Sequence, residues 1–277
     1  METYEKTERT VKVPCRLLTL DLDGTLLNSN HNVSPGNIEA LQAAERQGVM
    51  VTLVSGRMHQ SILPTSRKIG LSNPIISYNG GMVKHAETNE VYFHRPVPRP
   101  TAVRLIEYCE QADLHLNFSW NDQLYVKELN DWSQLYQSRT GVVAEATGGL
   151  LNLPEVEPTK MQVLVDPELI VDLFAEFQRQ FDRDLYITRT MPEYIEFMNP
   201  QVSKGDAIIA LADQLGIPIA ETMAFGDGFN DESMMRTAGF SVAMANAVDE
   251  IKRISDYVTT SNDEDGVAKA VQKLVLN

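Results

Sequence analysis

Short apolar runs alternate with amphipathic segments along the first eighty residues of the chain. Three of these runs have the length and composition of buried strands: 16–20, 49–54 and 74–78. A helix is predicted after the first run, with Ser34 as N-cap and Pro35 in the first turn, and another helix over about 58–69. Strand, helix, strand, helix, strand is the order of right-handed parallel units, so this part of the chain predicts a parallel sheet.

The pattern changes after residue 82 and returns after residue 198. Two short runs at 82–84 and 91–93 flank a polar turn and predict a hairpin, and the elements that follow do not repeat the parallel order. From a helix capped by Ser203 onward, strands and helices alternate again. We therefore predict an α/β protein with a parallel sheet and an inserted α+β domain. The predicted boundaries are 1–12 for a flexible leader, 13–82 and 199–277 for the sheet domain, and 83–198 for the insertion.

Composition and charge narrow the classes of function. Hydrophobic residues make up 43% of the 277 residues, enough for a buried core, and the net charge of −14 disfavours a general nucleic-acid surface, which is normally basic. No stretch approaches the ~18 apolar residues of a membrane span, and the polar first twelve residues lack a signal-peptide centre. We expect a cytoplasmic protein, monomeric or homodimeric, that binds neither nucleic acid nor a membrane.

Two acidic clusters far apart in the chain carry the main chemical information: residues 21–26 (DLDGTL) and 226–231 (GDGFND). Each follows a predicted buried strand, and the carboxyl ends of parallel strands lie at the same edge of a sheet. At least three carboxylates should therefore converge, where they would raise one another's pKa. A hard divalent cation is the simplest compensation, and oxygen ligands together with a substrate phosphate suit Mg²⁺. The clusters thus point to phosphoryl chemistry.

The first cluster offers a nucleophile and a proton carrier. Asp21 directly follows its strand, so its carboxylate can attack phosphorus and form an aspartyl phosphate. Asp23 points the same way along an extended chain and can protonate a leaving alkoxide and later deprotonate water. Gly24 lets the backbone turn sharply, so that amides can face phosphate oxygens. An ordinary turn and a calcium loop are the alternatives, but the twelfth position of such a loop holds Asn32 instead of Glu.

Polar groups also follow the other predicted strands. Ser55, Gly56 and Arg57 end the second strand and suit a phosphate or another polar group of a substrate. Asn79 follows the third strand, and Lys204 lies at a predicted helix N-terminus, where a cation opposes the helix dipole unless an anion accompanies it. Each has a simpler explanation, since Ser-Gly turns are common and most lysines are exposed. The convergence of several strand ends is more informative than any single motif.

The second cluster suits metal binding. Asp227, at a strand end, can bind Mg²⁺ directly, and Asp231, in the first helical turn, can hold a water molecule of the metal. The alternative is an Asp N-cap followed by an acidic first helical turn. Together with Asn230, however, these residues place polar groups on too many positions of one turn for capping alone.

Taken in order, 21–26, Ser55, Lys204 and 226–231 resemble the four motifs of the haloacid dehalogenase-like (HAD) hydrolase superfamily. Residues 55–57 and 79–81 and the insertion, which would be a cap over the site, resemble its Cof-type branch. The resemblance spans 16–277, and it implies that the core is a doubly wound, Rossmann-like parallel sheet. It implies these roles: Asp21 as nucleophile, Asp23 as general acid and base, Ser55 and Lys204 as ligands of the transferring phosphoryl group, Asn230 near the phosphate, and Arg57 and Asn79 nearer the substrate. It also implies Mg²⁺ held by the Asp21 carboxylate, the Asp23 backbone carbonyl and Asp227, with support from Asp231.

Asp23 narrows the reaction class. The dehalogenase members of the superfamily lack this second Asp, and the P-type pumps have Thr there and carry membrane helices. A second carboxylate fits hydrolysis of a phosphomonoester, where an alkoxide must be protonated. We predict a Mg²⁺-dependent phosphatase, a phosphoric monoester hydrolase acting on small phosphorylated metabolites such as sugar phosphates or phosphorylated cofactors. A sugar phosphomutase and a non-catalytic phospho-ligand-binding protein on the same fold remain the alternatives.

Overall fold

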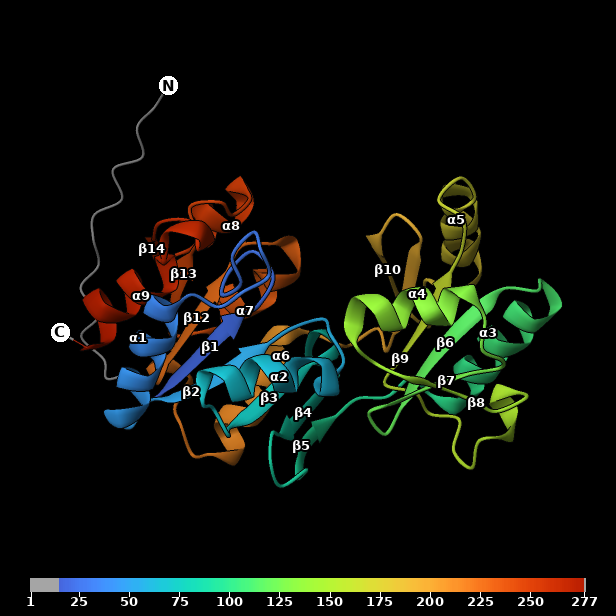
Figure 1. Cartoon of the computed structure of the whole chain (residues 1–277), viewed down its shortest axis with the longest axis horizontal. Helices are drawn as coiled ribbons and strands as arrows, with labels where there is room; N and C mark the ends of the chain where they lie inside the picture. The colour runs from blue at the N-terminus through green and yellow to red at the C-terminus, as the bar shows by residue number, and fades with distance from the viewer. Residues whose placement is uncertain (1–14, 277) are drawn as a thin grey trace. The chain divides into compact units, whose positions relative to one another are not determined.

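The computed structural model describes residues 15–276, which form two compact units (Figure 1). Among the described residues, the core unit comprises 15–57, Ile62–Phe93 and 203–276. The cap unit comprises Met58–Ser61 and His94–Val202. The predicted leader, residues 1–12, lies outside the described residues. No helix in the described part of the chain is both long and apolar enough to cross a membrane.

The core unit contains an eight-stranded sheet in the order β14-β13-β12-β1-β2-β3-β4-β5. Its strands are β1 Leu17–Asp21, β2 Met50–Val54, β3 Pro74–Ser77, β4 Met82–His85, β5 Val91–His94, β12 Thr222–Gly226, β13 Phe240–Ala243 and β14 Tyr257–Val258. The strands from β14 to β3 are parallel, and β4 is antiparallel to β3. The chain moves outward from β1 through β2 and β3, and from β12 through β13 and β14 on the other side. The predicted doubly wound sheet is confirmed, and its order reverses between β1 and β12.

Helices α1 Pro35–Arg46, α2 His59–Ile69, α7 Glu232–Thr237 and α8 Asp249–Ile254 connect successive parallel strands. Helix α6 Lys204–Gln214 precedes β12, and α9 Gly266–Val271 follows β14 and continues as a π-helical turn over Gln272–Leu276. Both predicted N-caps are present. Ser34 accepts a hydrogen bond from the amide of Asn37 at 3.1 Å, and Ser203 accepts one from the amide of Asp206 at 3.0 Å. Each cap satisfies an amide that has no partner within its helix. Ser203 therefore determines where α6 begins.

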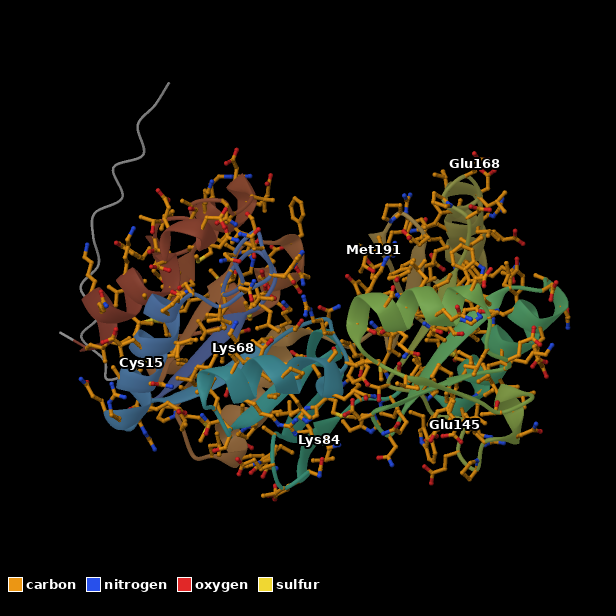
Figure 2. All side chains as sticks on the ribbon, viewed as in Figure 1. Cys15, Lys68, Lys84, Glu145, Glu168 and Met191 are labelled. Carbon is orange, nitrogen blue, oxygen red and sulfur yellow. The ribbon has the colours of Figure 1, made fainter. Side chains whose placement is uncertain are left out.

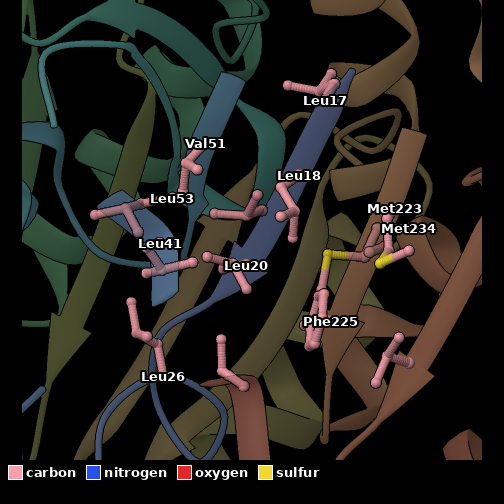
Figure 3. Packing of buried hydrophobic residues seen from close by; sticks show 14 of the residues in the cluster. Leu17, Leu18, Leu20, Leu26, Leu41, Val51, Leu53, Met223, Phe225 and Met234 are labelled. Atoms are coloured by element: carbon pink, nitrogen blue, oxygen red, sulfur yellow. The ribbon is translucent and has the colours of Figure 1, made fainter. Parts of the chain in front are cut away.

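The hydrophobic core surrounds β1, whose five residues are all buried. Figure 3 shows Leu18 and Leu20 of this strand among buried side chains of neighbouring strands and helices, including Leu41 of α1 and Phe225 of β12. Burying a leucine or phenylalanine side chain contributes about 1.5–3 kcal/mol. This packing holds the carboxyl end of β1, and therefore Asp21, in a fixed position.

The cap unit is an α+β domain with its own hydrophobic core. Its six-stranded sheet has the order β10-β11-β9-β6-β7-β8, and the pairings are antiparallel except between β7 and β8. The strands are β6 His115–Trp120, β7 Gln123–Val126, β8 Ala144–Ala146, β9 Lys160–Leu164, β10 Tyr186–Met191 and β11 Tyr194–Met198, and the helices are α3 Arg99–Gln111, α4 Asp131–Thr140 and α5 Ile170–Phe181. Glu145 and Glu168 are among the exposed acidic side chains of this unit (Figure 2).

One predicted boundary differs from the structure. The sequence analysis began the insertion at residue 83, because a hairpin interrupts the parallel order there. In the structure, β4 and β5 of that hairpin extend the core sheet, and Val83 is buried in the core cluster opposite Ile76 of β3. An antiparallel edge strand on a parallel sheet is common. The core unit therefore continues to Phe93, and it resumes at Ser203 instead of residue 199.

Candidate active site

The carboxyl ends of three neighbouring strands bring predicted site residues to one edge of the core sheet. Asp21 is the last residue of β1 and pairs in register with Val54 of β2, which directly precedes Ser55. On the other side of β1, strand β12 ends at Gly226, directly before Asp227. Strand pairing thus brings three residues together that are far apart in the sequence.

Lys204 is the central cation of the site. Its Nζ donates hydrogen bonds of 2.6 Å to Oδ1 of Asp21 and 2.6 Å to Oδ1 of Asp231, and its side chain is fully buried. Burial alone would lower the pKa of Lys204, but the charges of Asp21 and Asp231 outweigh burial and raise it. The two carboxylates explain why a lysine occupies the first turn of α6, where the helix dipole disfavours a cation.

Asp231 braces the loop after β12. Its Oδ2 accepts hydrogen bonds from the amides of Asp227 and Gly228, each at 2.9 Å, while its Oδ1 accepts from Lys204. Gly226 allows this close approach, because a Cβ there would lie 2.7 Å from the Asp231 Cβ. Asp231 is fully buried and uses both carboxylate oxygens to hold the site together.

The site holds more negative than positive charge. Burial, followed by the charge of Asp231, raises the pKa of Asp21 well above its usual value, although Lys204 opposes the shift. Burial is also the main cause that raises the pKa of Asp227 to about 6, against a 2.8 Å hydrogen bond from Thr25. One ammonium group does not balance three carboxylates, so the cluster favours binding of a further cation.

The geometry fits a hard divalent cation. Asp21, Asp227 and Asp231 each offer a carboxylate oxygen, and these oxygens lie within 4.8 Å of one another. Within residues 15–276, no donor binds the Oδ2 atom of Asp21 or of Asp227, whereas both oxygens of Asp231 accept hydrogen bonds. Asp227 is therefore available as a direct ligand through Oδ2. Asp21 has an open Oδ2 and also a second lone pair on Oδ1, the oxygen that Lys204 binds, and Asp231 supports the loop that carries Asp227.

Asp23 lies outside this cluster and is paired with Arg57. The guanidinium donates from Nε to Asp23 Oδ2 at 2.9 Å and from Nη2 to Asp23 Oδ1 at 2.5 Å. The Asp23 side chain is 49% exposed and the Arg57 side chain is 36% exposed. Asp23 is therefore not part of the buried carboxylate cluster. Arg57, which was expected to lie nearer the substrate, binds the Asp23 carboxylate in this structure.

The loops after β2 and β3 bind each other through their backbones. The amide of Asn79 donates to the carbonyl of Ser55 at 3.0 Å, and the amide of Tyr78 donates to the carbonyl of Arg57 at 3.0 Å. Tyr78 and Asn79 both have left-handed backbone angles, with φ of 53° and 55°. Such angles are costly for a buried tyrosine and persist only where the surroundings impose them. The turn thus holds Ser55 and Arg57 in place.

Gly80 continues this turn and contacts the start of α6, a role that the sequence analysis did not assign. Its φ is 98°, and a Cβ there would lie 2.1 Å from the carbonyl oxygen of Ser203 and 3.0 Å from the amide nitrogen of Lys204. Only glycine permits this approach. The Asn-Gly-Gly sequence at 79–81 predicts a turn, but its contact with a helix start more than a hundred residues away is visible only in the fold.

Asn230 and Gly56 lie close to Asn79. The Asn230 amide donates to Oδ1 of Asn79 at 3.4 Å, and a Cβ at Gly56 would lie 2.9 Å from the same atom. Asn230 is exposed and Asn79 is partly exposed. The structure therefore brings together residues that follow three strands: Gly56 after β2, Asn79 after β3 and Asn230 after β12.

Gly24 lies directly against the Asp227 carboxylate. Its φ is 84°, and a Cβ there would lie 2.3 Å from Oδ2 of Asp227. The carbonyl of Gly24 accepts a 2.7 Å hydrogen bond from Asn246, another residue that sequence reasoning missed. Asn246 follows β13, and no motif near it marks a functional role. The requirement for glycine at position 24 is steric as well as conformational.

Comparison with known proteins agrees with this arrangement. Residues 18–271 match the model of the family Hydrolase_3, described as haloacid dehalogenase-like hydrolase. The chain belongs to this family. The predicted HAD superfamily and Cof-type branch are confirmed.

Named relatives extend over almost the whole chain. Phosphatase YwpJ of Bacillus subtilis (strain 168) is 31% identical over 286 residues, which cover 94% of this chain and 100% of the relative. The same organism's 5-amino-6-(5-phospho-D-ribitylamino)uracil phosphatase YcsE is 30% identical, covering 95% and 97%. The structure of TM0651 from Thermotoga maritima has a TM-score of 0.88 at 29% identity and covers 95% of this chain and 98% of its own. The prediction that this HAD hydrolase is a phosphatase is confirmed by these relatives. The roles of individual residues stay predictions.

Proposed function

We propose that this phosphatase hydrolyses small phosphomonoesters, such as sugar phosphates or phosphorylated cofactors, with Mg²⁺ and through an aspartyl-phosphate intermediate. The observation that supports the proposal most is the hydrogen bonding of the Asp21 carboxylate. Lys204 holds one of its carboxylate oxygens at 2.6 Å, and the other is free of donors within residues 15–276. A buried carboxylate that is oriented by one oxygen and open at the other suits a nucleophile.

The chain's own residues account for both halves of the reaction. Asp21 Oδ2 attacks phosphorus as the ester P–O bond breaks, and Asp23 gives its proton to the leaving oxygen. Asp23 then removes a proton from water, which attacks phosphorus and releases phosphate and the Asp21 carboxylate. Lys204 stays bound to Asp21 throughout and stabilises negative charge near the reacting oxygens.

Mg²⁺ would be held by the Asp21 and Asp227 carboxylates and the Asp23 backbone carbonyl, with Asp231 in support. When bound, it would supply positive charge to the oxygens of the transferring phosphoryl group. Ser55 is available for the same group. Its Oγ accepts a 3.2 Å hydrogen bond from the Arg57 amide, so its hydroxyl proton can be donated to a phosphoryl oxygen.

The name of one relative supports the proposal of a small phosphorylated substrate. YcsE is named for a phosphorylated ribitylamino uracil, a small metabolite. The net charge of −14 disfavours nucleic acid as a partner. We further propose that the protein works as a monomer or homodimer in the cytoplasm.

A phosphate-release screen over a panel of phosphorylated metabolites, with Mg²⁺ present, tests the proposal. At least one metabolite should release inorganic phosphate in the same amount as ester is lost. The Asp21→Asn variant should lose turnover by about 10³-fold or more while its unfolding midpoint stays within a few degrees. Conversion of a sugar phosphate into its isomer without phosphate release would identify a mutase instead. Full turnover by Asp21→Asn would overturn the mechanism.

A further inference from the structure

The Asp23–Arg57 pair has the geometry of an orienting device. Two nitrogens of one guanidinium bind the two oxygens of one carboxylate, at 2.9 and 2.5 Å. This two-point contact specifies the plane of the carboxylate as well as its position. The pair is exposed, and exposed ion pairs contribute little to stability. The main effect of the pair is therefore on the orientation of the Asp23 carboxylate and not on stability.

Arg57 itself is anchored on both sides of its backbone. Its amide donates to the Ser55 hydroxyl at 3.2 Å, and its carbonyl accepts from the amide of Tyr78 at 3.0 Å. Tyr78 lies in the left-handed turn and is fully buried. The guanidinium thus extends from a rigid base, so it can transfer that rigidity to Asp23.

Asp23 differs from the other carboxylates of the site in the residue that holds its side chain. Asp21 and Asp231 are held by buried Lys204, and Asp227 is held by Thr25. Arg57 provides the side-chain hydrogen bonds that Asp23 accepts within residues 15–276. Without Arg57, the half-exposed carboxylate would be free to rotate among its staggered rotamers.

We propose that Arg57 is a positioning residue that aims Asp23 at the ester oxygen of the substrate, an inference that rests on the proposed function. In the first step the Asp21–phosphorus bond forms, the phosphorus–ester oxygen bond breaks and the proton of Asp23 goes to that oxygen. Arg57 touches neither bond. Its effect must pass through the proton transfer, so it grows as the leaving group becomes more basic.

Two aryl esters of similar size separate this role from phosphate binding. p-Nitrophenolate leaves readily without a proton, whereas phenolate, whose conjugate acid has a pKa of about 10 like that of tyrosine, needs one. With enzyme in excess and Mg²⁺ present, Arg57→Gln should slow phosphoryl transfer from phenyl phosphate by about tenfold or more, and from p-nitrophenyl phosphate by less than about threefold. Arg57→Lys keeps the positive charge but loses the two-nitrogen contact with Asp23. Its rate on phenyl phosphate should lie between those of the wild type and Arg57→Gln.

A double-mutant cycle gives the second readout. If Arg57 acts through Asp23, adding Arg57→Gln to Asp23→Asn should produce no further loss on phenyl phosphate. Arg16→Gln is the matched control, because Arg16 forms an exposed ion pair with Glu221 in the core unit, at 3.4 Å. It should change neither substrate's rate. Circular dichroism melting of each variant checks that the fold is retained.

Equal slowing of both esters by Arg57→Gln, with effects that add to those of Asp23→Asn, would overturn the inference and make Arg57 a phosphate ligand. That result would leave the proposed function intact, provided that the wild type releases phosphate and Asp21→Asn does not. A wild-type enzyme that transfers no phosphoryl group from either ester or from the metabolite panel would overturn both.

Discussion

Each unit of the protein contains a buried lysine paired with carboxylate, and the two pairs differ in their balance of charge. In the cap unit, Lys160 Nζ donates to Glu196 Oε1 at 2.9 Å, and Gln162 donates to the same oxygen at 3.2 Å. In the core unit, Lys204 bridges Asp21 and Asp231. The lysine side chains are 4% and 0% exposed. Burial alone lowers the pKa of each lysine, and the neighbouring acids raise it above its ordinary value.

The difference separates a structural pair from a site prepared for ligands. Lys160 and Glu196 neutralise each other, and the Gln162 amide adds a second hydrogen bond to the same Glu196 oxygen. Lys204 faces two carboxylates with Asp227 close by. Burial first, and the charge of Asp231 in addition, raises the pKa values of Asp21 and Asp227, although Lys204 opposes both shifts. Among residues 15–276, Asp21, Asp227 and Asp231 form the only group of three potential metal ligands. Buried charge by itself therefore does not mark a site, but unbalanced buried charge does.

The largest effect is expected from Lys204→Met. The substitution leaves Asp21 and Asp231 buried without their cation and removes a donor that stabilises the reacting oxygens. Phosphate release should fall by about 10²–10³-fold, and the free energy of unfolding by about 3–5 kcal/mol. Phosphate-release kinetics and urea denaturation measure both. A variant with normal turnover would show that the unbalanced pair has no role in the reaction.

Lys160→Met should affect stability but not metal binding. One buried carboxylate, Glu196, loses its partner, which costs about 3–5 kcal/mol in unfolding free energy. The double variant Lys160→Met/Glu196→Leu should recover most of that loss, because it removes both charges. The apparent Mg²⁺ affinity of both variants, measured by calorimetry, should equal that of the wild type. A change in Mg²⁺ affinity would contradict the separation of the two pairs.

Mg²⁺ should stabilise the wild type and restore the activity that EDTA removes. At a free concentration of about 100 times its dissociation constant, the gain in unfolding free energy is about 2.7 kcal/mol. The gain should be absent in Asp227→Asn, which lacks one of the two open carboxylates. Thermal melting with and without Mg²⁺ measures it. Metal-independent turnover would count against a cation at this cluster.

The smallest effect concerns pH. The pKa of Asp227 is about 6, raised mainly by burial. A proton on this carboxylate competes with the metal, so Mg²⁺ affinity should fall as the pH drops through about 6. The loss should be about tenfold at one pH unit below that value. Asp21, whose pKa is also raised, acts in the same direction. Calorimetric titrations at pH 7, 6 and 5 measure the trend, and an unchanged affinity would mean that Asp227 is not a ligand.

Much of the site was predictable because parallel strands end at one edge of a sheet. The apolar runs before Asp21, Ser55 and Asp227 identified buried strands, and their pairing alone brought these residues together. The lysine at a helix start indicated an anionic partner, and the structure supplies Asp21 and Asp231. Residues 83–93 of the hairpin were assigned to the wrong unit, because alternation reveals a strand but not the sheet edge that it joins.

The order of strands and helices along the chain, the helix caps and the residue types at the strand ends follow from local spacing and polarity, so the sequence alone predicted the fold class and the cluster of carboxylates. The roles of that cluster in catalysis and in cation binding stay predictions. Which oxygen accepts from which donor depends on tertiary packing. Only the fold brought Asp231 to Lys204, paired Asp23 with Arg57 and set Gly80 against the start of α6. These contacts join residues that are far apart in the sequence, in one case by more than a hundred residues. The direction of each side chain is set by neighbours that only tertiary packing brings close.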